Sequence, residues 1–415
     1  MYALAIDLGT TTLAASLIKL EDGQRLAMTG SMNPQRRFGA DVVSRLDAAL
    51  HSKETLREMS QLICAELWRL ADKLCTTTAI PWDKVQQVAI AGNPAMQHIL
   101  LGMPVRSLAF PPYRPVTTEG TTSRAHDLGW TGNAHVYIFP MPGGFVGGDT
   151  VAFLLGAQPG DATLCLDMGT NGEMALVAGD TIWATSAAAG PAFEGGNLTC
   201  GMAALPGAIA SVGIRDERLT LKVIGNIPPI GICGSAAIET VTGLLQHNII
   251  EAGGRLRAPD EIPSNLANRV IVHQDENAFV LYRDAKQLLL LTQGDIRQIQ
   301  LAKSAIRAGM EVLADKSCIR LQALRDVILT GSFGAVLQPE WLKTIGIFDS
   351  GMVQMSRFTP EGALAGVERA ILADDGFASA ERLARQFRVI PLSGTPLFET
   401  LFMQHINFPD HNHDL

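Results

Sequence analysis

The sequence predicts an α/β protein of two related halves, each opening on a β-hairpin with an acidic residue before its turn. Two segments of the 415-residue chain are nearly alike, YALAIDLGTTT at residues 2–12 and ATLCLDMGTNG at residues 162–172. Each has an apolar run, an aspartate, a Gly-Thr turn and a second apolar run, the pattern of two strands joined by a turn. Strand-loop-helix units accompany both copies, so the repeat indicates two α/β domains.

The repeated turns carry residues suited to binding polyphosphate. Glycine lets backbone N–H groups approach an anion closely, and carboxylates bind the Mg²⁺ that accompanies polyphosphate. A single such hairpin is equally well a plain turn, because Asp and Gly favour turns. Two in corresponding places predict one phosphate site. Its residues are Asp7, Gly9, Thr10, Thr11 and Thr12 in the first copy, and Asp167, Gly169, Thr170, Asn171 and Gly172 in the second.

Composition describes a globular protein with a large core. Hydrophobic residues make up 47% and charged residues 18% of the chain, against a typical charged share of about 25%. The net charge of −8 and the lack of a Lys/Arg run argue against nucleic acid. No apolar run reaches the roughly 18 residues of a membrane span, and no signal-peptide pattern opens the chain. We therefore expect a cytoplasmic protein that binds neither nucleic acid nor membrane.

Six cysteines are scattered without a Cys-x-x-Cys motif, so we expect reduced thiols and no iron–sulfur cluster in this chain. Cys200 and Cys233, each followed by glycine, are the pair that a shared cluster or redox role would use.

The first half predicts helices between its strands. Asp41 is an expected N-cap, and the apolar residues over 55–74 recur at helical spacing, which indicates a helix facing the core. The loop PMPGGFVGGD then enters a helix over 148–156 and places Asp149 near its N-terminus. Between them we expect a strand-loop-helix unit over 85–102, an irregular segment over 104–132 and a strand over 135–140.

The second half also predicts helices and strands after its hairpin. Residues 181–196 are small and must lie close to backbone or ligand, and a tail over 387–409 is apolar enough to dock on the body. We expect His411 and His413, which lie outside the residues that the structure describes below, to form an exposed end. The remaining expected elements are a glycine-led helix over 231–250, an amphipathic helix over 302–319, a buried strand over 326–330 that enters a Gly-Ser-Phe-Gly loop, and a helix over 362–372.

This order of parts resembles the nucleotide-binding core shared by actin, heat-shock chaperones and sugar kinases. The resemblance implies a two-domain actin-like ATPase with duplicated ribonuclease-H-like domains and a nucleotide cleft between them. It makes DLGTTT and LDMGTNGE the phosphate loops, and the helices over 148–156 and 362–372 the connectors. The adenosine loop would be Gly331, Ser332, Phe333 and Gly334. The implied domains are 1–158, 159–362, and 363–415 as connector helix and tail returning to the first domain.

A closer likeness covers nearly the whole chain. The stretches NPQRRFGADVVSR, AGNPAMQHILLG, AAAGPAFEGG and CGMAALPGAI resemble the ATPase domain of the reductive activators of corrinoid proteins. This resemblance implies ATP and Mg²⁺ as cofactors, a corrinoid protein as partner and a possible homodimer. ATP hydrolysis would help to reduce an inactive cob(II)alamin centre of a methyltransferase system to cob(I)alamin.

The chain departs from the fuller form of those activators, which usually carry a cluster-binding domain ahead of the ATPase core. Here the first phosphate strand begins at residue 2. Either the chain is part of a longer protein, or a separate iron–sulfur protein supplies the electron, or the core serves another purpose.

Asp149 is the expected catalytic residue. In sugar kinases that resemble this architecture, an aspartate of a Gly-Asp pair acts as base toward the accepting hydroxyl, and in a hydrolase it orients water for attack on the γ-phosphate. The structural alternative is a helix cap, worth about 1 kcal/mol. Three hypotheses follow: an ATP-hydrolysing activator, a small-molecule kinase, or a nucleotide-dependent binding module without turnover.

Overall fold

The computed structural model describes residues 1–169, 171–331 and 337–410, which divide into two compact units. Unit 1 comprises Met1–Cys165, Ala175–Thr185 and Thr359–Pro391. Unit 2 comprises Leu166–Met174, Ser186–Phe358 and the chain from Leu392 onward. The predicted duplicated α/β architecture is confirmed, since two six-stranded sheets are present among the described residues.

A six-stranded sheet forms the centre of unit 1, in the order β3-β2-β1-β4-β6-β5. Strand β1 pairs antiparallel with β2 and parallel with β4, and β4 pairs parallel with β6. The carboxyl ends of β1, β4 and β6 therefore meet at one edge of the sheet. The bounds are β1 Tyr2–Leu8, β2 Thr12–Lys19, β3 Arg25–Met32, β4 Val85–Gly92, β5 Thr121–Arg124 and β6 His135–Ile138.

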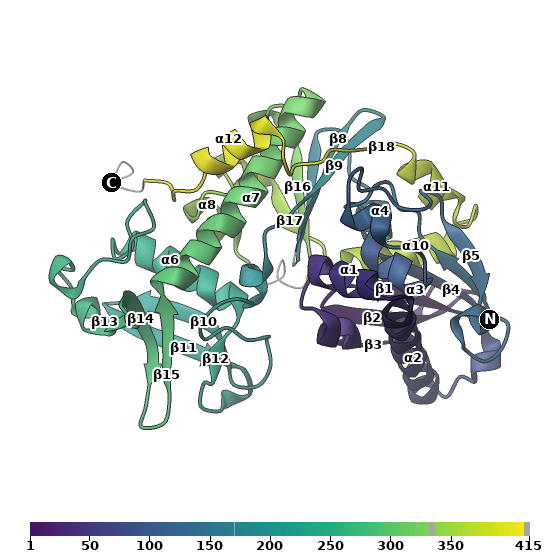
Figure 1. Cartoon of the computed structure of the whole chain (residues 1–415), viewed down its shortest axis with the longest axis horizontal. Coiled ribbons are helices and arrows are strands. Elements are labelled where there is room, and N and C mark those ends of the chain that lie inside the picture. Colours follow the sequence, from purple (N-terminus) through teal and green to yellow (C-terminus); the bar gives the residue numbers. More distant parts are fainter. Residues whose placement is uncertain (170, 332–336, 411–415) are drawn as a thin grey trace. The chain divides into compact units, whose positions relative to one another are not determined.

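Helices cover this sheet on both faces. Figure 1 shows α1, α2 and α3 grouped over its strands, while α5 and α10 pack on each other and on β4. Successive residues of β1 are buried, as expected for a strand covered on both sides. The helices predicted over 55–74, 148–156 and 362–372 are confirmed as α2, α5 and α10. The bounds are α1 Val42–His51, α2 Lys53–Thr78, α3 Pro94–Leu100, α4 Arg106–Ala109, α5 Gly148–Ala157, α10 Gly362–Leu372 and α11 Ala378–Ala384.

The second six-stranded sheet has the order β17-β16-β7-β8-β9-β18. The predicted second hairpin is its β7–β8 pair. Residues 181–187, expected as part of a small-residue stretch, form strand β9 because Ile182 and Ala184 alternate into the core. The bounds are β7 Thr163–Met168, β8 Gly172–Ala178, β9 Thr181–Ala187, β16 Asp326–Thr330, β17 Ser356–Phe358 and β18 Phe387–Val389.

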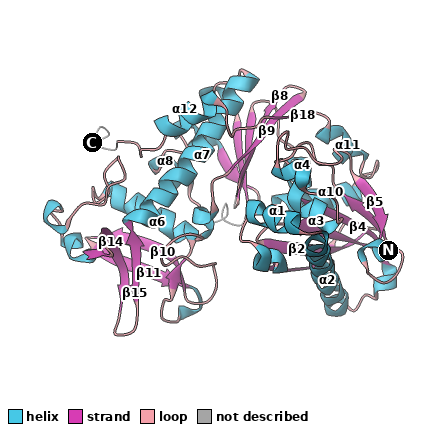
Figure 2. Ribbon diagram, viewed as in Figure 1, coloured by secondary structure: helices cyan, strands magenta, loops and turns pink. Residues whose placement is uncertain are grey.

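Unit 2 adds two three-stranded sheets, β11-β10-β12 and β13-β14-β15, and several helices. Figure 2 shows α6 beside β10 and β11. Helix α7 begins ahead of the predicted start at residue 302, because Thr292 and Asp295 form a capping box at its N-terminus. The bounds are β10 Ala208–Arg215, β11 Arg218–Val223, β12 Gly231–Ile232, β13 Val270–His273, β14 Glu276–Arg283, β15 Leu288–Thr292, α6 Gly234–Gln246, α7 Gln293–Ser317, α8 Pro339–Thr344, α9 Ser350–Met355 and α12 Pro396–Gln404.

The C-terminal tail packs within unit 2. Helix α12 lies along α7, where Ser304 and Lys303 donate hydrogen bonds to the carbonyl oxygens of Phe402 and Asn407. The prediction returned all of 363–415 to the first domain, whereas only the part up to Pro391 lies in unit 1. The difference arises because α7 presents polar groups that the tail backbone satisfies. Within the described ranges, no helix has the length and hydropathy needed to cross a bilayer.

Candidate functional site

The first predicted phosphate loop follows β1 at the edge where the parallel strands end. Asp7 is half-buried, and Thr10 is buried in the turn that leads into β2. A Cβ on Gly9 would lie 2.3 Å from the carbonyl oxygen of Thr12. Only glycine therefore closes this turn without moving its backbone.

Two asparagines hold this loop in place. The Asn33 side chain donates to the carbonyl oxygen of Gly9 at 2.9 Å, and its backbone N–H donates to the carbonyl oxygen of Thr11 at 2.9 Å. The Asn93 side chain donates to the Thr10 hydroxyl at 2.8 Å. Neither asparagine had a predicted role, although the repeated Asn-Pro pair was a usable signal. Each asparagine also caps the short helix that its proline begins.

Asp149 is brought to the same edge by the tight junction of α5 with the end of β4. The Gln97 side-chain oxygen accepts hydrogen bonds from the backbone N–H groups of Gly92 and Gly148, at 3.3 and 3.2 Å. A Cβ on Gly148 would lie 2.5 Å from that oxygen, and a Cβ on Gly147 would lie 2.5 Å from the carbonyl oxygen of Gly92. The Gly-Gly pair thus lets the helix start in contact with the strand end.

The Asp149 carboxylate lies in the first turn of α5, where the N-cap is Gly147. It accepts the backbone N–H of Thr150 at 2.7 Å. Burial raises the pKa of Asp149 to about 6, against the opposing effect of the hydrogen bonds from Thr150. A carboxylate with this pKa is mostly ionised at neutral pH and remains able to exchange a proton there, as a general base must.

The second predicted phosphate loop lies beside Gly331, the one described residue of the predicted adenosine loop. Gly331 follows β16 with φ +99°, and a Cβ there would lie 2.6 Å from the Oδ1 atom of Asp167. The turn after Asp167 is closed by the Gly169 N–H, which donates to the carbonyl oxygen of Asn171 at 3.2 Å. On the following strand, the Glu173 carboxylate accepts the Ser186 hydroxyl at 3.2 Å.

The predicted site residues thus form two groups. Unit 1 brings Asp7, Gly9 to Thr12 and Asp149 to one sheet edge. Unit 2 contains Asp167, Gly169, Asn171, Gly172 and Gly331, and Asp167 lies beside Gly331. The remaining predicted residues, Thr170, Ser332, Phe333 and Gly334, lie outside the described residues.

The two cysteines singled out from the sequence have separate partners. The Cys200 sulfur accepts the backbone N–H of Leu290 at 3.3 Å, and burial raises the pKa of this thiol. The buried Cys233 thiol lies 3.3 Å from the Ser235 hydroxyl. A raised pKa disfavours the thiolate that a metal or a disulfide exchange requires.

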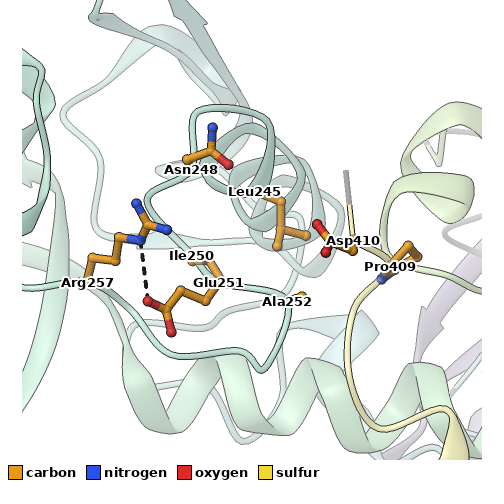
Figure 3. A pocket seen from close by; sticks show the side chains of 8 residues that line it. All are labelled: Leu245, Asn248, Ile250, Glu251, Ala252, Arg257, Pro409 and Asp410. Carbon is orange, nitrogen blue, oxygen red and sulfur yellow. Dashed lines mark ion pairs between the residues drawn. The ribbon is translucent and has the colours of Figure 1, made fainter. Parts of the chain in front are cut away.

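A cavity of about 110 Å³ lies elsewhere in unit 2, near the end of α6 (Figure 3). One wall carries the ion pair of Glu251 with Arg257, at 3.4 Å. None of the predicted nucleotide residues lines it. The lining residues are Leu245, Asn248, Ile250, Glu251, Ala252, Arg257, Pro409 and Asp410.

Two family models together match nearly the whole chain. Residues 161–415 match the family model described as the C-terminal domain of RACo, the ASKHA domain, and residues 2–158 match the RACo middle region. The chain is 30% identical over 420 aligned residues to the corrinoid activation enzyme RamQ of Eubacterium limosum, covering 99% of this chain and 71% of that protein.

Two further proteins are similar to most of this chain. A [Co(II) methylated amine-specific corrinoid protein] reductase of Methanosarcina barkeri is 26% identical, covering 83% of this chain and 65% of its own length. A solved reductive activator for corrinoid, iron–sulfur protein superimposes with a TM-score of 0.86 at 29% identity, over 99% of this chain and 66% of that one. The chain therefore spans about two thirds of the length of these two proteins.

The matches confirm the predicted ATPase-domain resemblance and the actin-like fold. The chain belongs to the RACo family, of which it contains the middle region and the C-terminal ASKHA domain.

Proposed function

We propose that this protein hydrolyses Mg-ATP to drive the reductive reactivation of a corrinoid protein of a methyltransferase system. The observation that carries the proposal is membership of the RACo family along the whole chain, with named relatives that act on corrinoid proteins. The turns after Asp7 and Asp167 both lie at strand ends. Gly9 closes the first turn and Gly331 approaches Asp167, and this placement supports ATP as the energy source.

The nucleotide roles follow from the donor types. The N–H groups and hydroxyls of Gly9 to Thr12 would bind phosphate oxygens, as would the turn from Gly169 to Gly172. The resemblance to actin-like ATPases implies that the loop from Gly331 to Gly334 would hold adenosine. Asp7 and Asp167 would hold Mg²⁺, directly or through water. The bound ion neutralises charge on the transferred phosphoryl group.

Asp149 is proposed as the residue that orients water for attack on the γ-phosphate. Its half-buried carboxylate and its pKa of about 6 suit an ionised base at neutral pH. The same Gly-Asp geometry favours one alternative, a small-molecule kinase in which Asp149 takes the proton of an acceptor hydroxyl.

The electron would come from an iron–sulfur donor on another domain or protein, and ATP-driven closure would bring the corrinoid into reach. We place the reaction in the cytoplasm, which suits six free cysteine thiols. A homodimer is part of the proposal.

The decisive experiment follows phosphate release and corrinoid reduction under anaerobic conditions. The chain, Mg-ATP, a reduced iron–sulfur donor and a cob(II)alamin-loaded partner are mixed, and cob(I)alamin is followed by its absorption. We expect cob(I)alamin to form only with ATP, with phosphate release stimulated by the partner. Phosphorylation of an added small molecule would favour the kinase instead, and ATP binding without turnover would favour a binding module.

A further inference from the structure

Arg45, on α1, is a fully buried arginine in unit 1. Its Nε donates to the carbonyl oxygen of Gly39 at 3.0 Å, and its Nη1 donates to the Met96 sulfur at 3.4 Å. The buried Nη2 has no hydrogen-bond partner, and Arg45 forms no ion pair with any residue that the structure describes.

Such a residue works against stability. A cation taken out of water without a carboxylate partner is costly, and apolar side chains of similar volume are often tolerated better at buried charged positions. Burial lowers the pKa of Arg45 to about 10, with Asp41 opposing the shift, so the guanidinium stays charged at neutral pH. Its retention in the core calls for a role other than packing.

The contacts of Met96 connect this arginine to the first phosphate loop. The Met96 sulfur accepts from the Asn33 side chain as well, at 3.7 Å, and Asn33 donates to the carbonyl oxygen of Gly9. The Met96 backbone N–H donates to the Asn93 side chain at 3.0 Å, and Asn93 donates to Thr10. Met96 therefore contacts both asparagines that hold the loop. Arg45 holds the Met96 side chain through its hydrogen bond to the sulfur.

We propose that Arg45 is a positioning residue for nucleotide binding, which holds Met96 and through it the two asparagines that set the first phosphate loop. The inference rests on the proposed function, since it assumes that this loop binds the phosphates of ATP. In this proposal the guanidinium acts through the positions of its nitrogens: Nε donates to Gly39 and Nη1 donates to Met96.

The test separates affinity from stability. Arg45→Met keeps a similar volume and removes the guanidinium. We expect this variant to unfold at or above the wild-type temperature. Its Kd for Mg-ATP, measured by calorimetry, should rise on the order of tenfold. Lys303→Met is the matched control. Among the described residues Lys303 is also a fully buried cation, it lies in unit 2, and its removal should leave the Kd unchanged.

Two further variants probe the geometry. Arg45→Lys retains the charge but cannot make both contacts, so its Kd should stay raised; a wild-type Kd would overturn the geometric role. Met96→Leu keeps the volume and removes the shared sulfur, so it should also weaken Mg-ATP binding. Met352→Leu, equally buried in unit 2, is its control.

The outcomes distinguish the two proposals. If wild-type protein binds Mg-ATP and both Arg45→Met and Met96→Leu bind it equally well, the inference is wrong and the proposed function stands. If Arg45→Met does not fold, Met96→Leu decides. If the wild-type chain binds no Mg-ATP, both proposals fall.

Discussion

At the scale of single residues, the environment of Asp149 combines two opposing effects. Burial at the start of α5 disfavours the charged carboxylate, while the N–H and hydroxyl of Thr150 favour it. Burial is the larger effect, so the pKa rises from 3.8 to about 6. Carboxylates with raised pKa values are concentrated at functional sites.

Asp149→Asn should abolish ATP hydrolysis while retaining Mg-ATP binding. It should also stabilise the fold at pH 7 by up to about 3 kcal/mol, because the folded-state pKa lies above the unfolded value. The ionised carboxylate opposes folding above pH 6, and this opposition fades as the pH falls from about 6 toward 3.8. The gain in thermal stability should therefore be larger at pH 7 than at pH 5. Hydrolysis at the wild-type rate would remove Asp149 from the catalytic role.

Gly331→Ala should lower both stability and nucleotide affinity. The left-handed φ of +99° strains any residue with a Cβ, and that Cβ would press on the Asp167 carboxylate. We expect a loss of roughly 1–3 kcal/mol in urea unfolding and a higher Kd for Mg-ATP. Gly253→Ala is the control in the same unit, because its Cβ would meet open space. Unchanged Mg-ATP affinity in Gly331→Ala would argue against a role for this carboxylate.

At the scale of elements, glycines let α5 and α10 cross at backbone distance. A Cβ on Gly366 would lie 1.6 Å from the carbonyl oxygen of Ala152, and a Cβ on Gly156 would lie 2.9 Å from the backbone nitrogen of Gly366. The same α10 carries Glu368, which pairs with Arg25 at 2.7 Å on the neighbouring strand β3. Close backbone contact thus fixes the crossing of the two helices, and the ion pair ties α10 to the sheet.

Gly366→Ala should destabilise unit 1 by about 1–3 kcal/mol, because the helices must separate to admit the methyl group. Thermal unfolding of the whole chain measures the loss. Gly160→Ala, where the Cβ has no neighbour within 4 Å, should change the melting temperature little. Equal melting of both variants would contradict the tight crossing.

At the scale of the whole molecule, each unit carries one acidic strand end that is proposed to bind magnesium. Asp7 belongs to unit 1 and Asp167 to unit 2. A ligand that binds only the folded chain stabilises it by about 2.7 kcal/mol at a hundredfold excess over its Kd.

Mg-ATP should therefore raise the melting temperature of the full chain, and Asp7→Asn and Asp167→Asn should each reduce this shift. Removal of Mg²⁺ with EDTA should reduce the shift in wild-type protein more than in either variant, because the variants already lack one proposed ligand. A full shift in either variant would remove that aspartate from the site. Glu21→Gln, an exposed surface change in unit 1, is the control.

The repeated Asp-Gly-Thr pattern was sufficient to predict the two hairpins and the duplicated α/β fold, whereas the family was predicted from resemblance over longer stretches such as NPQRRFGADVVSR and AAAGPAFEGG. Local signals sufficed here because a glycine turn between apolar runs has few alternatives. Helices over 55–74 and 362–372 were likewise predictable from apolar spacing. Strand β9 was missed although Thr181, Ile182 and Trp183 are residue types that favour strands, because the segment was grouped with the small residues that follow it.

The sequence by itself therefore determined the chemistry available to this protein: acidic residues, glycine turns and hydroxyls in the order of a nucleotide-binding core. Only the tertiary structure decided which residues support that chemistry. Gln97 joins a strand end to α5, Asn33 and Asn93 hold a loop remote from them in the chain, and Arg45 is buried without a carboxylate. Such contacts join residues far apart in sequence, and no local pattern specifies them, because they arise from packing.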